Sequence, residues 1–217
     1  MFPPSWGDSE SLLRYVKAQG EMVAIAFLGT MLAAVIALPL SFIAARNTTV
    51  SQVLRFLARR SFDTLRGVDT LVWALIWVNV VGLGPFAGVL AIAISDIGSF
   101  GKLFSEAIEA SDRKPVEGVM ASGGSRLHAI RFGILPQVAP VLISQYLYYF
   151  ESNTRSATII GIVGAGGIGL QLSEQIRTLE WQTVCFIIIL ILVTVSIIDL
   201  ISTRLRIAIA GTARTTI

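Results

Sequence analysis

The chain has little of what a soluble enzyme uses for chemistry. Its 217 residues include a single cysteine, Cys185, and a single histidine, His128, which excludes a disulfide within the chain and makes a zinc site of these residue types a poor prospect. Charged residues make up 14% of the chain, whereas soluble domains carry roughly 25%. The phosphate-binding sequence G-x-x-x-x-G-K-S/T is absent, so ATP chemistry would have to come from another chain.

What the chain has instead is apolar sequence. Hydrophobic residues make up 54% and the mean hydropathy is +0.74, which is typical of an integral membrane protein. A spanning helix needs about 18 to 20 apolar residues, and several uncharged runs approach or exceed that length. They are 22–45, 70–95, 132–150, 156–173 and 181–198. Because they show no alternation of apolar and polar residues with period 2, we predict an all-α, polytopic helical bundle.

The basic residues indicate how these runs cross the membrane, because Lys and Arg near span ends stay on the cytoplasmic side. Basic residues flank 70–95 at both ends, which favours two spans joined at the turn sequence GLGP, 82–85. The same reasoning favours a single span from 137 to 161. We therefore expect the N-terminus outside and the C-terminus in the cytoplasm of a bacterial-type cell. The five predicted spans are 22–45, 62–81, 85–106, 137–161 and 181–203.

The predicted organisation is one transmembrane domain, 21–206, between two terminal segments. Residues 1–20 would lie outside, where 6–19 form either a short amphipathic helix on the membrane surface, anchored by Trp6, or a tail without a function. This segment has charged residues and no apolar centre, so no cleavable signal peptide is visible. A cytoplasmic tail is expected at 207–217, and the sizeable cytoplasmic element between spans is 107–136.

Part of that element, EGVMASGGSRLHAIRFGILP at 117–136, is a polar and basic segment within a very apolar chain. Apolar residues recur along it at helical spacing, while polar residues take the other faces. Gly123 and Gly124 interrupt the pattern, which predicts two short helices that meet at a bend. Pro136 then opens the next span. From these residues alone, an ordinary interfacial loop and a segment that binds a partner fit about equally well.

The spacing of Glu117, Gly123 and Pro136 resembles the cytoplasmic EAA loop of ABC importer permeases. That pattern reads E-A-A, three residues, G, nine residues, I, one residue, and L-P. In this chain its two alanines and its isoleucine are replaced by Gly118, Val119 and Gly133. With these replacements, the chain resembles permeases of phosphonate, phosphite and hypophosphite importers. The segments that carry this resemblance are IRFGILPQVAP, YYFESNTRSATIIGIVGAGGIG, FLGTMLAAVIALPLSFIAARN, VWALIWVNVVGLGPFAGVLAIAI and GKLFSEAIEA. The resemblance covers residues 22–206.

The resemblance implies a type I ABC importer fold, like that of methionine permeases, and a permease subunit that carries a small phosphorus oxyanion across the cytoplasmic membrane. The implied partners are a second permease, either a copy or a homologue, two ATPase subunits, a periplasmic or extracellular substrate-binding protein, and the lipid bilayer; no nucleic acid is expected. ATP and Mg would bind to the ATPase, and this chain would be neither an enzyme nor a cofactor or metal protein. The residues expected to couple it to the ATPase are Glu117, Gly118, Ser122, Gly123, Gly124 and Pro136.

Two other functions compete with this interpretation. A permease for an amino acid such as methionine would share the loop and the GAGG segment, and the sequence leaves open which phosphorus compound would be carried. A membrane-embedded enzyme would need two convergent catalytic groups at defined spacing. The acidic residues Glu151, Asp96 and Asp199 do not show such a spacing.

Ionisable residues inside spans are costly and usually functional. Glu151 and Arg155 lie four residues apart on one helix face. They form either a structural ion pair, or a site in which Arg155 contacts an anion in transit and Glu151 keeps the binding weak. The other polar residues predicted along the path are Asn153, Ser156, Thr158, Asp96, Ser99 and Asn79. A helix cap or an interhelical hydrogen bond would explain the last three equally well.

The sequence GAGGIG at 164–169 matches the dinucleotide pattern G-x-G-x-x-G. Residues 156–163 could pass for the strand that precedes a nucleotide site, but the second strand-helix unit that such a site requires does not follow. Glycines at the outer end of a span instead suit close helix contacts, a re-entrant turn or an outer gate. The candidate gate residues are Gly164, Gly166, Gly167 and Gly169.

Overall fold

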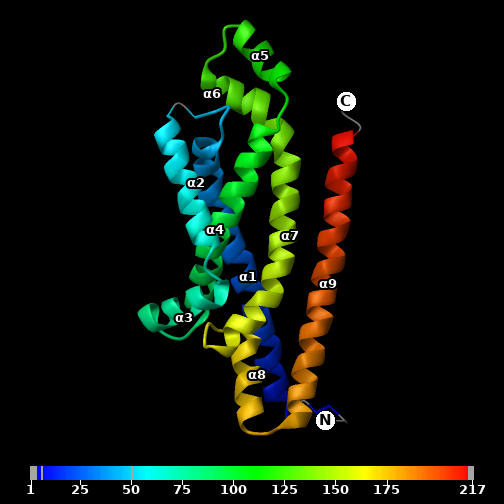
Figure 1. Cartoon of the computed structure of the whole chain (residues 1–217). Coiled ribbons are helices and arrows are strands. Elements are labelled where there is room, and N and C mark those ends of the chain that lie inside the picture. Colours follow the sequence, from blue (N-terminus) through cyan, green and yellow to red (C-terminus); the bar gives the residue numbers. More distant parts are fainter. Residues whose placement is uncertain (1–3, 6, 50, 215–217) are drawn as a thin grey trace.

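The structure is a computed structural model that describes residues 4–5, 7–49 and 51–214, with side chains described up to residue 209. All regular secondary structure in these ranges is helical. Figure 1 shows the long helices running along one axis, with α5 and α6 at one end of the bundle and α8 at the other. The elements are α1 (Ser9–Ala44), α2 (Gln52–Arg66), α3 (Thr70–Val81), α4 (Pro85–Glu109), α5 (Arg113–Ala121), α6 (Arg126–His128), the π-helical segment η1 (Ala129–Ile134), α7 (Leu135–Ile162), α8 (Ile168–Arg177) and α9 (Trp181–Arg214).

The helices agree with the predicted membrane bundle of about five spans. Within the described residues, four helical stretches are long and apolar enough to cross a membrane. α2 and α3 add a fifth crossing if the pair counts as one span. That span would be broken, because the two helices are bent by 86° relative to each other. The four stretches are Ser9–Ala44, Pro85–Glu109, Arg126–Ile162 and Trp181–Ile209.

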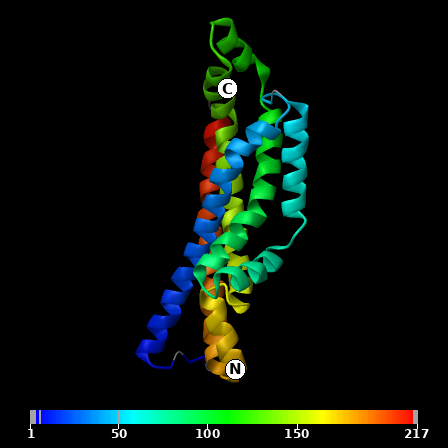
Figure 2. The same cartoon turned by 90° about the vertical axis from the view of Figure 1, so that its left-hand side faces the viewer.

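The predicted span at 62–81 is not one continuous helix. Asp69 accepts a hydrogen bond from the backbone N–H of Leu71 at 2.8 Å and so caps a new helix, α3, which lies across the bundle in Figure 2. α2 is a separate helix that buries Phe62 against α4. A Cβ at Gly98 of α4 would lie 2.7 Å from the carbonyl oxygen of Phe62, and a Cβ at Gly101 would overlap its ring. The two glycines of α4 therefore allow α2 to pack at close range.

The N-terminal segment also differs from the expectation. From Ser9 onward it is the start of α1 and not a separate surface helix; Trp6 lies outside the described residues. Asp8 caps α1 by accepting a hydrogen bond from the N–H of Ser9 at 2.7 Å. The helix continues straight into the span because its buried face is already present here, at Tyr15 and Ala18.

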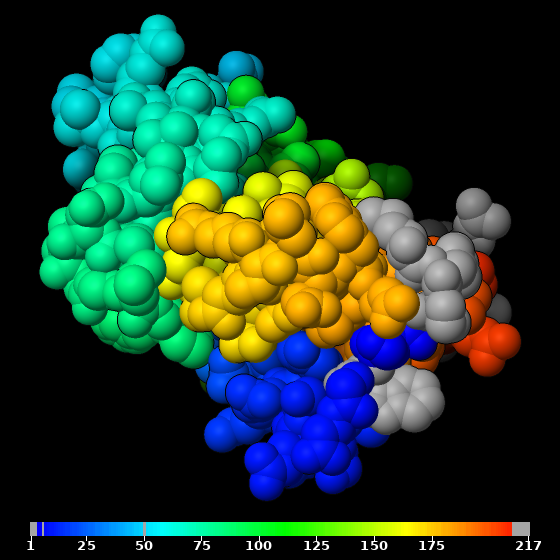
Figure 3. Space-filling view, turned by 90° about the horizontal axis from the view of Figure 1, so that it is seen from below, coloured from blue at the N-terminus to red at the C-terminus, as the bar shows by residue number. Residues whose placement is uncertain are grey.

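α8 is a helix that the sequence did not predict. The chain leaves α7 through a turn at 163–167, in which Gly164, Gly166 and Gly167 have φ values of 99°, 84° and 73°. Figure 3 shows α8 at this end of the molecule, between the α3–α4 hairpin and the start of α1. The predicted Gly-rich segment between the last two spans is therefore a tight turn followed by a short amphipathic helix.

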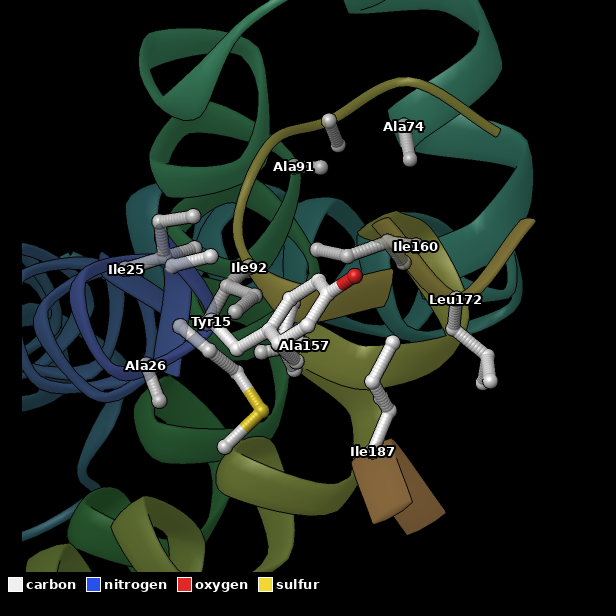
Figure 4. Packing of buried hydrophobic residues seen from close by; sticks show 14 of the residues in the cluster. Tyr15, Ile25, Ala26, Ala74, Ala91, Ile92, Ala157, Ile160, Leu172 and Ile187 are labelled. Carbon is white, nitrogen blue, oxygen red and sulfur yellow. The ribbon is translucent and has the colours of Figure 1, made fainter. Parts of the chain in front are cut away.

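Two buried hydrophobic clusters hold the bundle together. The first joins α1, α3, α4, α7, α8 and α9, and Figure 4 shows side chains of this cluster, among them Ile92 and Ile160, between these helices. The second lies toward α5 and joins α1, α4, η1 and α7. In a bilayer such contacts stabilise mainly through close packing, which small residues promote. At Gly29 of α1, for example, an added Cβ would lie only 2.8 Å from the Cβ of Ile92.

Candidate functional site

The segment predicted to couple the chain to an ATPase consists of α5, the bend after it, α6 and η1; we call it the coupling segment, residues 113–134. α5 ends at Ala121 with Ser122 as its C-cap, and Gly123 follows with a φ of 84°. The backbone N–H groups of Gly123 and Gly124 donate to Met120 O and Val119 O at 3.1 and 3.0 Å. A glycine in the left-handed region is a common way to end a helix, so the predicted bend at Gly123 is confirmed.

Beyond the bend, the chain enters the long helix without interruption. Ser125 caps α6, with its hydroxyl 2.8 Å from Nδ1 of His128, and η1 then continues directly into α7, where Pro136 occupies the first turn. α5 folds back onto η1 so closely that a Cβ at Gly133 would lie 3.1 Å from Cα of Val116. The glycine at the isoleucine position of the loop pattern therefore has a structural reason.

A side chain that the sequence reading missed holds the coupling segment to α7. The Oε1 of Gln137 accepts a hydrogen bond from the N–H of Asp112 at 3.0 Å, and its Nε2 donates to Asp112 O at 3.2 Å and to Gly133 O at 2.5 Å. Asp112 is the N-cap of α5. These bonds fix the start of α5 to the first turns of α7. The only indication of Gln137 in the sequence is its place directly after Leu135 and Pro136.

The outer face of the coupling segment is open. Glu117, Gly118, Ser122 and Gly123 are exposed, and Glu117 has no hydrogen bond or ion pair within the described residues. Leu127 of α6 is 77% exposed, which is a large exposed fraction for an apolar side chain. A cavity of about 270 Å³ lies next to this face and includes Glu117 in its lining. The arrangement suits a partner with both an apolar and a basic contact.

The end of α4 is attached to the same end of the bundle by a carboxylate that two arginines share. Glu109 Oε1 lies 2.7 Å from Nη2 of Arg59 and accepts a hydrogen bond from the backbone N–H of Arg46 at 2.7 Å. Asn47 donates from Nδ2 to Ile108 O at 2.7 Å. The connection between α1 and α2 is thus fixed beside the coupling segment.

Within the bundle, the structure pairs Glu151 with Arg155, as the sequence predicted, and adds a partner that it did not. Nη2 of Arg155 lies 3.0 Å from Oε1 of Glu151, and Nη2 of Arg206 on α9 lies 2.8 Å from Oε2. The Glu151 side chain is 8% exposed, against 49% for Arg155. The guanidinium of Arg206 also lies over the ring of Tyr148, 5.8 Å from its centre. We call Glu151, Arg155 and Arg206 the α7–α9 charge cluster.

Two other predicted path residues form a separate buried network. Nδ2 of Asn153 donates to Oγ1 of Thr30 at 2.8 Å and to Oδ2 of Asp96. All three side chains are buried, and they come from α7, α1 and α4. Asn153 therefore points into the subunit and away from Arg155, which is half-exposed on another face of α7.

The remaining predicted path residues do not converge on Arg155. Asn79 is exposed on α3 and donates to Leu75 O at 2.7 Å. Thr158 points toward α1, with Oγ1 at 3.0 Å from Sδ of Met22. Ser156 lies within 3.4 Å of the carbonyl oxygen of Ser152, and Ser99 is half-buried on α4.

The predicted gate glycines are buried within the subunit. Gly84 N donates to Gly164 O at 3.0 Å, which links the turn after α7 to the GLGP turn. A Cβ at Gly166 would lie 2.7 Å from Pro85 N, and one at Gly167 would lie 3.1 Å from Cα of Met22. A Cβ at Gly169 would overlap the carbonyl oxygen of Thr158. The close contacts that the sequence predicts for these glycines are present, and a role as an outer gate stays a prediction.

Comparisons with known proteins agree with this arrangement. HtxC of Stutzerimonas stutzeri, whose name describes a permease of a phosphite transport system, is 43% identical over 214 residues. These residues cover 99% of this chain and 75% of HtxC. The phosphite transport system permease protein PtxC of the same organism is 37% identical over 204 residues, 94% of this chain and 73% of PtxC.

Among solved structures, an inward-facing MetNI methionine ABC transporter matches with a TM-score of 0.78 at 18% identity, covering 93% of this chain and 99% of that one. At this identity the likeness shows the fold alone, and it confirms the predicted type I, methionine-permease-like bundle. Residues 37–208 match a family described as the inner membrane component of binding-protein-dependent transport systems. The chain, a multi-pass membrane protein, belongs to this family of transport permeases.

Proposed function

We propose that this chain is the permease subunit of an ATP-driven importer for a small phosphorus oxyanion such as phosphite, hypophosphite or a phosphonate. The observation that carries the substrate class is the 43% identity to HtxC over nearly the whole chain. The likeness to a methionine transporter concerns the fold alone and gives an amino-acid substrate no separate support.

The distribution of basic residues supports an orientation in the membrane. Arg46 and Arg59 contact Glu109 at the end of α4, and Arg113 and Arg126 begin α5 and α6. Because α5 and α6 lie at one end of the bundle (Figure 1), we place this end in the cytoplasm. α1 then begins outside, and α9 ends inside. An extracytoplasmic binding protein would deliver substrate to the end of the bundle that carries α8, and the ATPase would bind at the cytoplasmic end, against α5.

We further propose that the coupling segment transmits motion between the ATPase and the spanning helices. Its exposed face, with Glu117 and Leu127, is free to bind a partner, while Gln137 and the unbroken path from η1 to α7 fix it to a span. A rigid connection of this kind moves α7 when the partner moves α5. ATP and Mg would be held by that ATPase, and this chain would hold no cofactor.

The Arg155 side chain supports a second permease as a partner. It is 49% exposed within the spanning helix α7, and an arginine there is costly against lipid. A water-filled passage between two permeases would provide a polar surrounding for it. We therefore propose that Arg155 lines the path, and that Glu151 limits how tightly an anion binds.

The test is uptake by the assembled importer. The chain is reconstituted in liposomes with its ATPase, its binding protein and, where one is encoded, its second permease. ATP-dependent uptake is then measured with phosphite, hypophosphite, methylphosphonate and methionine. We expect uptake of at least one phosphorus compound and none of methionine; methionine uptake alone would show the substrate class to be wrong.

A further inference from the structure

The structure joins Arg206, at the basic end of α9, to the only buried glutamate among the described residues, Glu151. We propose that the α7–α9 charge cluster is a weak oxyanion-binding site within the spanning part of the path, in which Glu151 occupies both arginines until an anion displaces it. This inference rests on the proposed function. It adds a ligand residue, Arg206, and a mechanism of release that sequence reasoning did not identify.

The geometry of the cluster resembles an occupied anion site. Each carboxylate oxygen of Glu151 contacts a different arginine, at 3.0 Å from Arg155 and 2.8 Å from Arg206. The two oxygens thus lie where two oxygens of a tetrahedral phosphorus oxyanion would bind, because guanidinium groups recognise carboxylates and such oxyanions with the same donors. Glu151 acts here as an internal substitute for the ligand.

The charges also favour an anion. Two guanidinium groups face one carboxylate, so the cluster keeps a net positive charge. Both arginines contact Glu151 through Nη2, and Nε and Nη1 of each have no hydrogen-bond partner within the described part of the chain. These donors remain available to a ligand, whereas the buried carboxylate has both oxygens engaged.

The surroundings hold Arg206 in place on a lipid-facing helix. Ile197, Leu200 and Ile201 of α9 are more than half exposed, so much of this helix is apolar on its surface. Arg206 itself is only 26% exposed, lies over the ring of Tyr148, and bonds Oγ1 of Thr203 at 3.1 Å. The ring and the hydroxyl orient the guanidinium toward α7, where Glu151 and Arg155 lie.

Competition by Glu151 would give the site a useful weakness. An anion must break two charge-assisted contacts to bind, so it is held less tightly than by two free arginines. When it leaves, the carboxylate returns and satisfies the arginines again. A transporter needs such weak sites, because tight binding would slow release into the cytoplasm.

The experiment compares variants of the reconstituted importer with phosphite as the probe, or with whichever phosphorus oxyanion the wild type carries. We expect Arg206→Gln to lower uptake about tenfold or more, as expected for loss of a charge-assisted contact, and Arg206→Lys to retain part of it. Glu151→Gln frees both arginines, so the anion should remain bound to the solubilised complex about tenfold longer while turnover falls.

Two controls separate ligand binding from structural damage. Glu109→Gln removes a carboxylate that also contacts two arginines, but on α4 and away from α9, and should not prolong retention of the anion. The double variant Glu151→Gln/Arg206→Gln keeps the net charge and leaves no buried carboxylate unpaired. We expect it to assemble normally and still transport poorly, because Arg206 is absent.

Wild-type rates in Arg206→Gln, or normal uptake by the double variant, would show that the cluster is only a structural ion pair. Equal anion retention in Glu151→Gln and wild type would have the same meaning. If the wild type carries no phosphorus oxyanion at all, the proposed function fails, and the ligand named here fails with it. If the wild type carries one and the variants behave like it, only the proposed binding site fails.

Discussion

Replacement of Gly123 by alanine tests whether the bend in the coupling segment matters for transport. Gly123 has a φ of 84°, and no atom lies within 4 Å of a Cβ built there, so the added methyl group meets no neighbour. The cost is in the backbone alone, about 1–2 kcal/mol for a residue with a Cβ in the left-handed region. This free energy lowers the population of the bent conformation about 5- to 30-fold relative to unbent alternatives.

Gly118 provides a matched control. It is equally exposed, and a Cβ there also meets nothing within 4 Å, but it lies inside α5 with an ordinary helical φ. Gly118→Ala should therefore stabilise α5 by about 1 kcal/mol, the reverse of the effect at Gly123. The loop pattern of related permeases also has alanine at this position.

The two variants are compared in the reconstituted importer by substrate-stimulated ATP hydrolysis and by hydrogen exchange of the amides of residues 119–126. We expect Gly123→Ala to exchange faster there and to lose much of the stimulation, and Gly118→Ala to retain both. Gly123→Asn should lose less than Gly123→Ala, because asparagine tolerates the left-handed region better. Equal exchange and equal stimulation in Gly123→Ala and Gly118→Ala would refute the reasoning.

Three further outcomes are expected. Glu117→Lys should leave insertion and thermal stability unchanged, since the carboxylate has no partner within the described residues, but should abolish substrate-stimulated ATP hydrolysis; normal stimulation would remove Glu117 from the ATPase contact. Arg155→Ala should reduce uptake with little effect on basal ATP hydrolysis, and unchanged uptake would remove this residue from the path. Gly169→Ala should destabilise the purified permease in detergent by about 1–3 kcal/mol because its Cβ overlaps the carbonyl of Thr158, whereas Gly20→Ala, with open space around it, should not; equal melting temperatures would contradict the close packing of α7 and α8.

The sequence predicted those features that depend on neighbouring residues. Long apolar runs gave the spanning helices, and GLGP gave the hairpin before α4. The predicted bend at Gly123 is confirmed. It was predictable because a glycine between two short helical stripes is a local signal. The break between α2 and α3 also has a local signal, since Asp69 precedes the apolar run that begins at residue 70 and caps α3, but the predicted span 62–81 crosses it.

Missed features have a different cause. The amphipathic sequence of α8 is short and polar, so it resembles a loop until the turn at Gly164 and Gly167 places it against α1 and α9. Gln137 directly follows Leu-Pro in the sequence, but the backbone N–H and carbonyl groups of Asp112 that it bonds lie 25 residues earlier in the chain. Such contacts depend on how the coupling segment folds back onto α7.

The amino-acid sequence by itself determined that the protein is a helical membrane protein with a polar segment between spans, because hydropathy, charge placement and glycine act locally. Only the tertiary structure decided which side chains meet. It directed Asn153 inward to Thr30 and Asp96 and joined Glu151 to Arg206, 55 residues further along the chain. The physical reason is that the rotation of each helix about its axis is set by packing against its neighbours, and that rotation selects the partners of every polar side chain.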